Sequence, residues 1–346
     1  MTRGTASALA AAVLFGASAP LAKLLLPSVD PLMLAALFYL GAGGALLATR
    51  ALRSRGAAAR EAPVSRADLP LLAGVTLAGG VAGPVLLLAG LSRVTGIAGA
   101  LLLNLEAPFT ILLALVFFGE HLSRRESLAA AFVIAGAALL GLRSGPLGAD
   151  LLGLASIAGA CLCWGLDNNW TQRLSLRDPV AVVSIKATSA GLCSLALALA
   201  TRQSLPSPAL AGMALAVGSL SYGASIVLAV YALRELGAAR ESALFATAPF
   251  AGALLAIPLL GEIPRGADCA GAAVMALGVL LLARARHEHV HAHEELEHEH
   301  SHVHDEHHRH AHAGAVPEPH SHVHRHEPLV HGHPHVSDLH HRHEHE

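Results

Sequence analysis

The sequence predicts an all-α integral membrane protein of ten transmembrane helices, arranged as two inverted five-helix repeats and followed by a disordered histidine-rich tail. Three observations lead to this prediction. Apolar runs of helix length follow one another through residues 1–286. Short motifs in the first half of this region recur in the second half at offsets of 141 to 149 residues. Of the chain's 24 histidines, 23 lie in the last 60 residues.

The apolar runs are too long and too numerous for a soluble domain. The chain is 53% hydrophobic and 14% charged, and a bilayer helix needs about 20 apolar residues to cross roughly 30 Å of hydrocarbon. The region 69–118 exceeds one span, and residues 92–96 supply its break. The ten expected spans are residues 5–26, 31–49, 69–91, 95–118, 126–142, 150–173, 179–200, 209–233, 239–260 and 267–283.

The first span resembles a cleaved signal peptide, because Ala17-Ser18-Ala19 has the small residues of a cleavage site. Pro20 would then be the first mature residue, and the apolar run continues to Leu26. We therefore expect a retained first helix.

Four short motifs recur in the same order along the apolar region. Each half holds five spans, an odd number, so the second half enters the membrane in the opposite sense. Inverted repeats are a recurring architecture of secondary transporters. We expect residues 1–145 and 146–286 to be the two repeats and residues 287–346 the tail. The recurring pairs are Phe15-Gly16 with Trp164-Gly165, Asp30-Pro31 with Asp178-Pro179, Ala107-Pro108-Phe109 with Ala248-Pro249-Phe250, and Gly119-Glu120 with Gly261-Glu262.

Arginine placement predicts the orientation, because cytoplasmic loops of membrane proteins are enriched in Lys and Arg. With the amino terminus inside, 14 arginines fall on the cytoplasmic side and only four, Arg93, Arg143, Arg202 and Arg265, on the outer side. Both termini, and with them the tail, are therefore expected in the cytoplasm.

Ionisable residues at depth in the membrane are costly and usually face a cavity or a partner. Glu106 lies about twelve residues from either end of its expected helix, close to the midplane, and is a proton site or cation contact, or a protonated carboxyl bonded to a neighbouring helix. Asp167 and Lys186 lie at depths of roughly 9 and 11 Å by helical rise. They suit an ion pair across two helices, which is either structural or, with Asn168, a polar wall of a substrate path.

Three further residues mark the expected path less strongly. Lys23 lies within a turn of the outer end of its helix, where its ammonium is expected to reach the membrane surface. Pro108 and Pro249 each remove an intrahelical hydrogen bond, which either frees carbonyls toward a cavity or is a tolerated packing kink.

The ordered motifs resemble those of the EamA-type permeases of the drug/metabolite transporter superfamily. The resemblance covers residues 5–285 and rests on these motifs: Phe15-Gly16 with Lys23, residues 105–109, Gly119-Glu120, Trp164-Gly165, Ala248-Pro249-Phe250 and Gly261-Glu262. It implies a ten-helix inner-membrane carrier that exports small organic solutes or amino acids. Thr247 stands where the first half has an acid, Glu106, so only the first half carries this carboxylate. The expected pathway residues are Glu106, Pro108, Trp164, Asp167, Asn168, Lys186, Pro249 and Lys23.

The tail alternates histidine with other residues, carries 3 Lys/Arg against 12 Asp/Glu, and has too few apolar residues to build a core. Neutral imidazole suits Zn, Ni and Cu as a ligand, so we expect the tail to bind divalent metal ions such as Zn, Ni or Co. An expression tag, a compositional expansion and a pH-responsive polyelectrolyte are the alternatives. The candidate metal ligands are His287, His289, His291, His293, His298, His300, His302, His304, His320, His322, His324, His326, His331, His333 and His335.

The sequence holds no nucleotide-binding loop, HExxH motif or serine elbow, so we expect no enzyme and no required cofactor. The favoured interpretation is a secondary transporter that exports a small organic metabolite or amino-acid-like solute. Divalent metal (Ni, Co or Zn) efflux with a collecting tail is the first alternative, and a membrane-anchored metal buffer is the second. The expected partners are the lipid bilayer, the solute and metal ions, without nucleic acid; a homodimer is left open.

Overall fold

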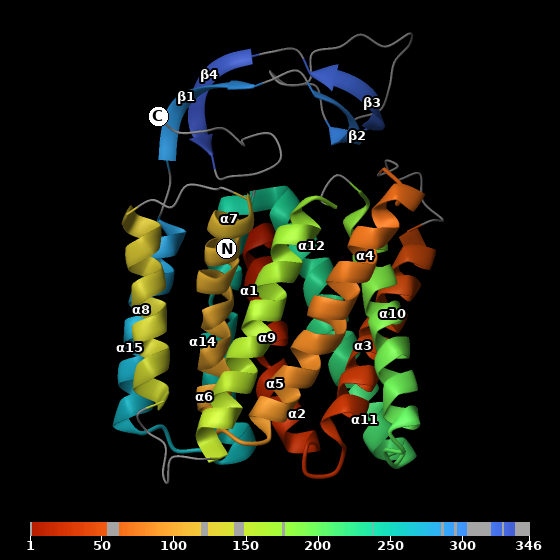
Figure 1. Ribbon diagram of the computed structural model, residues 1–346, viewed down its shortest axis with the longest axis vertical. Coiled ribbons are helices and arrows are strands. Elements are labelled where there is room, and N and C mark those ends of the chain that lie inside the picture. Colours follow the sequence, from red (N-terminus) through yellow and green to blue (C-terminus); the bar gives the residue numbers. More distant parts are fainter. Residues whose placement is uncertain are drawn as a thin grey trace.

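The computed structural model describes most of the chain as a bundle of helices, with four strands beyond one end of the bundle (Figure 1). The amino terminus lies toward the same end as the strands. The described residues are 2–53, 62–118, 124–141, 149–174, 177–236, 238–284, 287–293, 296–302, 320–326 and 329–335.

The helices follow the predicted spans closely, although five spans are built from consecutive shorter elements. Elements η1 and η3 are 3-10 turns, whereas η2 and η4 are π-helical. In order, they are α1 (Arg3–Gly16), α2 (Ser18–Leu25), α3 (Pro31–Arg53), η1 (Arg66–Asp68), α4 (Leu69–Val75), η2 (Thr76–Ala82), α5 (Gly83–Leu91), α6 (Gly96–Leu102), η3 (Leu103–Leu105), α7 (Glu106–Phe118), α8 (Arg124–Gly141), α9 (Ala149–Gln172), α10 (Pro179–Ala200), α11 (Pro208–Gly218), η4 (Ser219–Ala224), α12 (Ser225–Leu236), α13 (Ala238–Phe245), α14 (Ala248–Leu260) and α15 (Gly266–Ala283).

Nine helical stretches of the described chain are long and apolar enough to cross a membrane. They correspond to nine of the ten expected spans. The remaining span, expected at 126–142, is the helix α8, whose 18 residues include three charged ones, Arg124, Arg125 and Glu126, in the first turn. The nine stretches are Arg3–Leu25, Pro31–Leu52, Arg66–Leu91, Gly96–Phe117, Leu151–Gln172, Pro179–Ala200, Pro208–Leu233, Arg240–Leu260 and Gly266–Ala283.

The two predicted proline kinks are breaks between helices. Pro108 is the third residue of α7, directly after the 3-10 turn η3, and Pro249 is the second residue of α14, after a turn at Ala246 and Thr247. Proline is tolerated in the first turn of a helix because the N–H it lacks would have no intrahelical acceptor there. Each proline therefore starts a helix at mid-span.

Glycines let the helix backbones approach closely where the spans cross. A Cβ on Gly191 of α10 would lie 2.8 Å from the backbone nitrogen of Leu40 in α3. A Cβ on Gly136 of α8 would lie 2.8 Å from the carbonyl oxygen of Gly271 in α15. Small residues at such contacts allow the close packing on which helix association in lipid depends.

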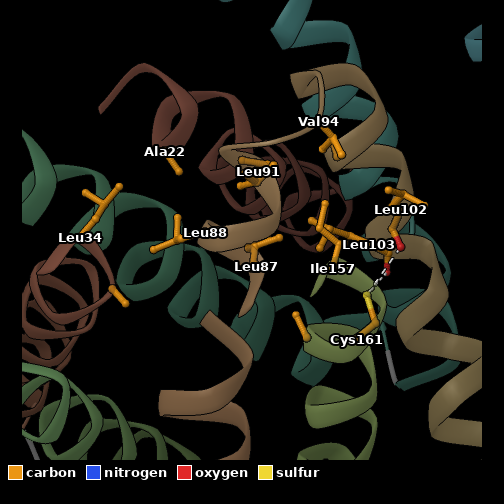
Figure 2. Packing of buried hydrophobic residues seen from close by; sticks show 14 of the residues in the cluster. Ala22, Leu34, Leu87, Leu88, Leu91, Val94, Leu102, Leu103, Ile157 and Cys161 are labelled. Carbon is orange, nitrogen blue, oxygen red and sulfur yellow. Dashed lines mark hydrogen bonds between the residues drawn. The ribbon is translucent and has the colours of Figure 1, made fainter. Parts of the chain in front are cut away.

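The helix neighbours cross between the two halves of the chain. Helix α3 packs against α10, α6 against α14 and α8 against α15, while α1 packs against α12 and α5 against α9. Figure 2 shows part of the buried apolar core, where Leu87 and Leu91 of α5 lie near Ile157 and Cys161 of α9. Cys161 is a free cysteine whose thiol donates to the Leu102 carbonyl at 3.6 Å, in keeping with a packing role.

Four strands lie in the described part of the tail. Strand β1 (His287–His293) pairs with β4 (Leu329–His335), and β2 (Leu296–His302) pairs with β3 (His320–His326), both antiparallel. The alternation of histidine with other residues is the pattern of an extended strand, in which alternate residues share one face.

Candidate functional site

A polar cluster lies where α9 packs against α7, and Glu106 is its acid. The Asn168 amide donates to the Glu106 carboxylate at 2.8 Å and lies 3.3 Å from the Thr110 hydroxyl. The neighbouring Asn169 amide donates to the Thr110 carbonyl at 3.0 Å and to the Gly165 carbonyl at 2.8 Å. Two consecutive asparagines of α9 thus bind the first turns of α7.

The Asn168 amide binds this acid at the start of α7. Glu106 is the first residue of α7, and its own backbone N–H donates to the Leu103 carbonyl of the preceding 3-10 turn. Glu106 is half-buried and Asn168 exposed, so this pair is not sealed inside the bundle.

Asp167 and Lys186 form the ion pair that their depths predict, and the pair links α9 to α10. The side chains of Asp167 and Lys186 are only 6% and 16% exposed. The Thr171 hydroxyl donates to the second carboxylate oxygen of Asp167 at 3.2 Å. Glu106 lies near enough to both charges to interact with them. Two acids and one base therefore share one region of the bundle.

The π-helical turn η2 contributes a carbonyl that the sequence analysis did not identify. The Trp164 indole nitrogen donates to the Gly79 carbonyl at 2.9 Å, and the Tyr39 hydroxyl donates to the same oxygen at 3.0 Å. A Cβ on Gly79 would lie 2.2 Å from a carboxylate oxygen of Asp167. Gly79 is thus required for the close approach of η2 to α9. Its only sequence signal is a small-residue spacing with Gly83, which is common in membrane helices.

The recurring glycine motifs meet the recurring proline motifs across the two halves. A Cβ on Gly165 of α9 would lie 2.9 Å from the backbone nitrogen of Thr110 in α7. A Cβ on Gly16 of α1 would lie 2.2 Å from the Ala248 carbonyl in α14. The motifs are therefore the contact points of two helix crossings. Pro249 lies at the second crossing and Pro108 at the first.

Lys23 lies apart from the cluster. Its ammonium donates to the Leu91 carbonyl at 2.7 Å and also to the Val94 carbonyl, at the end of α5. The Glu262 carboxylate accepts from the Gly96 nitrogen at 2.6 Å, at the start of α6. By helical rise, this end of the span is about 15 Å from Glu106. Lys23 thus holds a helix end, as does Glu262.

Several sequence candidates lie outside this region. Glu120, the counterpart of Glu262, lies outside the described residues, as does His304. The other candidate histidines lie on the four strands, of which the structure describes the backbone. Among the side chains that the structure describes, no group of three or more His, Cys, Asp and Glu could hold a metal ion.

The fold and the cluster define a class: a multi-pass membrane protein whose broken helices bring polar groups together inside the bundle, as transporters do. The model of the EamA-like transporter family matches residues 2–142 and again residues 151–284. The chain belongs to the EamA-like transporter family.

One relative agrees with this assignment, and one solved structure shares the fold. An uncharacterized transporter of Methanothermobacter thermautotrophicus is 32% identical over 297 residues, which cover 81% of this chain and 85% of that protein. A protein of known crystal structure shares the fold with a TM-score of 0.60 at 21% identity, covering 81% of this chain and 97% of that one. The protein is therefore a membrane transporter.

Proposed function

We propose that the protein is a ten-helix secondary carrier of the inner membrane, built as an inverted repeat with both termini in the cytoplasm. Helix α8 then adds a further span to the nine stretches described above. It is the fifth span along the chain, and each half has five spans. The π-helical turns η2 and η4 begin 143 residues apart, within the range of the motif offsets. The 14 arginines assigned to the cytoplasmic side support the orientation.

The helix contacts support the same repeat. If each span exchanges with its counterpart in the other half, the α1–α12 contact becomes the α9–α5 contact. The pairs α3–α10, α6–α14 and α8–α15 then map onto themselves. A two-fold arrangement of this kind places a substrate site near the midplane, between the halves.

The proposed cargo is a small organic metabolite or amino-acid-like solute, moved outward. The observation that carries this proposal is the cluster of Glu106 and Asn168 beside the Asp167–Lys186 pair. A carboxylate, an amide and an ammonium within one region can bind a solute that has both an amino and a carboxyl group. Trp164 and Pro108 border this region. No residue is assigned a catalytic role, and the transport proposed needs no cofactor.

Counterflow in proteoliposomes tests this proposal. Vesicles preloaded with one unlabelled amino acid or metabolite at a time should accumulate the same labelled solute only when the protein recognises it. Glu106→Gln should lower the accumulation about tenfold or more, because it keeps the shape and removes the charge. Glu235→Gln, at an exposed carboxylate of α12, is the matched control and should leave it intact. Accumulation that is unchanged in Glu106→Gln would refute the assigned site.

The histidine tail favours a second candidate function, divalent metal efflux, and a third, metal storage by an anchored tail. The proposed tail chemistry is binding of zinc, nickel or cobalt by neutral imidazoles. Affinity should then fall as pH falls through about 6.5, because protons compete for each imidazole.

Cells that express the full chain or residues 1–286 separate these candidates. Efflux predicts a lower cellular content of nickel, cobalt or zinc with the full chain, and storage predicts a higher content. An organic solute carrier predicts that loss of the tail leaves solute counterflow unchanged.

A further inference from the structure

The register of the tail strands sets histidine opposite histidine. In each antiparallel pair, three consecutive histidines of one strand face three of the other, and we call each opposed pair a rung. The rungs are His287–His335, His289–His333 and His291–His331 between β1 and β4, and His298–His324, His300–His322 and His302–His320 between β2 and β3.

The three rungs of each ribbon share one face. The histidines occupy alternate positions along every strand, and alternate residues of a strand lie on the same side. Directly opposed residues have Cβ atoms about 5 Å apart, and rungs two residues apart are separated by roughly 7 Å along the strand. Two adjacent rungs therefore offer four imidazole-bearing positions around one point. Zinc takes four ligands in a tetrahedron, with Zn–N distances of about 2 Å.

Each set of rungs ends in the same way. The fourth position on the histidine face pairs His293 with Leu329 in the first ribbon and Leu296 with His326 in the second. Both ribbons thus carry three rungs and, next to them, one pair with a single histidine. Two strand pairs drawn from different parts of the tail have the same layout.

We infer that the tail forms two zinc sites, which we call clasps. In each clasp, two adjacent histidine rungs bind one Zn²⁺ ion across an antiparallel ribbon. This inference rests on the proposed metal binding by the tail and specifies the sites. An isolated two-stranded ribbon is marginal in water, and metal binding supplies the free energy that a core would otherwise supply. The central rungs, His289–His333 and His300–His322, belong to every pair of adjacent rungs in their ribbons.

The nesting of the strands makes the two clasps unequal. Seventeen residues separate β2 from β3, whereas β1 and β4 are separated by both inner strands and all their connections. Once the inner ribbon is closed, only two residues join β1 to β2 and two join β3 to β4. Since closing a shorter loop costs less entropy, the inner clasp should strengthen zinc binding at the outer one.

Zinc titration of the full-length protein in detergent tests the clasps, with a chelating dye as competitor and residues 1–286 as the blank. His289→Gln should remove one tightly bound ion, and so should His333→Gln. The double variant His289→Gln/His333→Gln should still lack only that ion, because both residues hold the same one. His289→Gln combined with His322→Gln should remove two ions, because the two residues belong to different clasps. His307→Gln/His308→Gln, at two histidines that belong to no rung, is the control with equal histidine loss and should remove neither ion.

The inner variant gives a second readout. His322→Gln should weaken the remaining outer site by about tenfold or more, whereas His289→Gln should leave the inner site unchanged. If the partner and non-partner double variants lose the same number of ions, the rungs do not exist, although the tail binds metal. If the full chain binds no more zinc than residues 1–286, the proposed metal binding itself is wrong. Counterflow of organic solute is independent of both results.

Discussion

Two of the helix crossings between the halves, α7–α9 and α1–α14, have similar backbones and different chemistry. At both, a glycine of one span packs on the first turn of a helix that begins at mid-span with a proline motif: Gly165 on α7 and Gly16 on α14. At the α7–α9 crossing, Glu106 binds Asn168. At the α1–α14 crossing, Thr247 stands in place of the acid.

The contrast extends along α9. At the offset of 149 residues that relates Gly16 to Gly165, the counterparts of Asp167, Asn168 and Asn169 are Ser18, Ala19 and Pro20. Ser18 and Ala19 are buried. One crossing is thus equipped with charges and amides while the other is small and largely apolar. The recurring motifs thus mark where these helices cross and break, and local substitutions make one of the two crossings polar.

The largest effect on stability is expected when one partner of the Asp167–Lys186 ion pair is removed. Lys186→Met leaves the buried Asp167 carboxylate without its ammonium, which should cost about 3 to 5 kcal/mol of unfolding free energy. Thermal unfolding of the detergent-solubilised protein measures this. Asp167→Asn added to Lys186→Met removes the orphaned charge and should recover most of the loss. A double variant no more stable than Lys186→Met would contradict the pairing.

A smaller effect on stability is expected when a glycine at either crossing is replaced by a larger residue. Gly16→Ala and Gly165→Ala each place a Cβ against backbone, and overpacking of this kind costs about 1 to 3 kcal/mol. Gly16→Ala should cost more, because its Cβ would meet the Ala248 carbonyl at 2.2 Å against 2.9 Å at Thr110. Gly212→Ala is the control, since its Cβ would have nothing within 4 Å. The same unfolding assay ranks the three, and a harmless Gly16→Ala would contradict the close crossing.

The smallest effect should come from making the polar crossing more like its counterpart. Phe15 of α1 is the counterpart of Trp164 in α9, so Trp164→Phe makes the two positions identical. The change removes the indole donor to the Gly79 carbonyl. Because Tyr39 still donates to that oxygen, the loss should be about 1 kcal/mol. Removing the second donor by Tyr39→Phe as well should cost more than the sum of the single changes, since the carbonyl then has neither partner. Strict additivity would show that the two donors are independent.

The sequence predicted the parts of this account that follow from local pattern. Span lengths and the break at 92–96 follow from hydropathy, and the Asp167–Lys186 pair follows from equal depth along neighbouring spans. The prolines at 108 and 249 signalled irregular backbone. They could not show that each starts a new helix, because a kink and a break remove the same hydrogen bond.

The rest depended on tertiary contacts. The use of the Gly79 carbonyl by Trp164 and Tyr39 requires the π-helical turn and two other spans at once. The hydrogen bonds of Lys23 also depend on tertiary contacts, because their acceptors are carbonyls about 70 residues away. The register of the tail strands also depends on contacts between distant segments, and composition says nothing of register.

The most direct test of the account compares equivalent positions at the two crossings. Glu106→Gln and Thr247→Val each remove the polar group at the start of a mid-span helix, and solute flux in proteoliposomes is measured for both at equal protein content. We expect flux to fall about tenfold or more in Glu106→Gln, the scale of losing a charged hydrogen bond, and to stay near the unmodified value in Thr247→Val. Equal losses in the two variants, or a loss in Thr247→Val alone, would contradict the claim that the α7–α9 crossing carries the transport function.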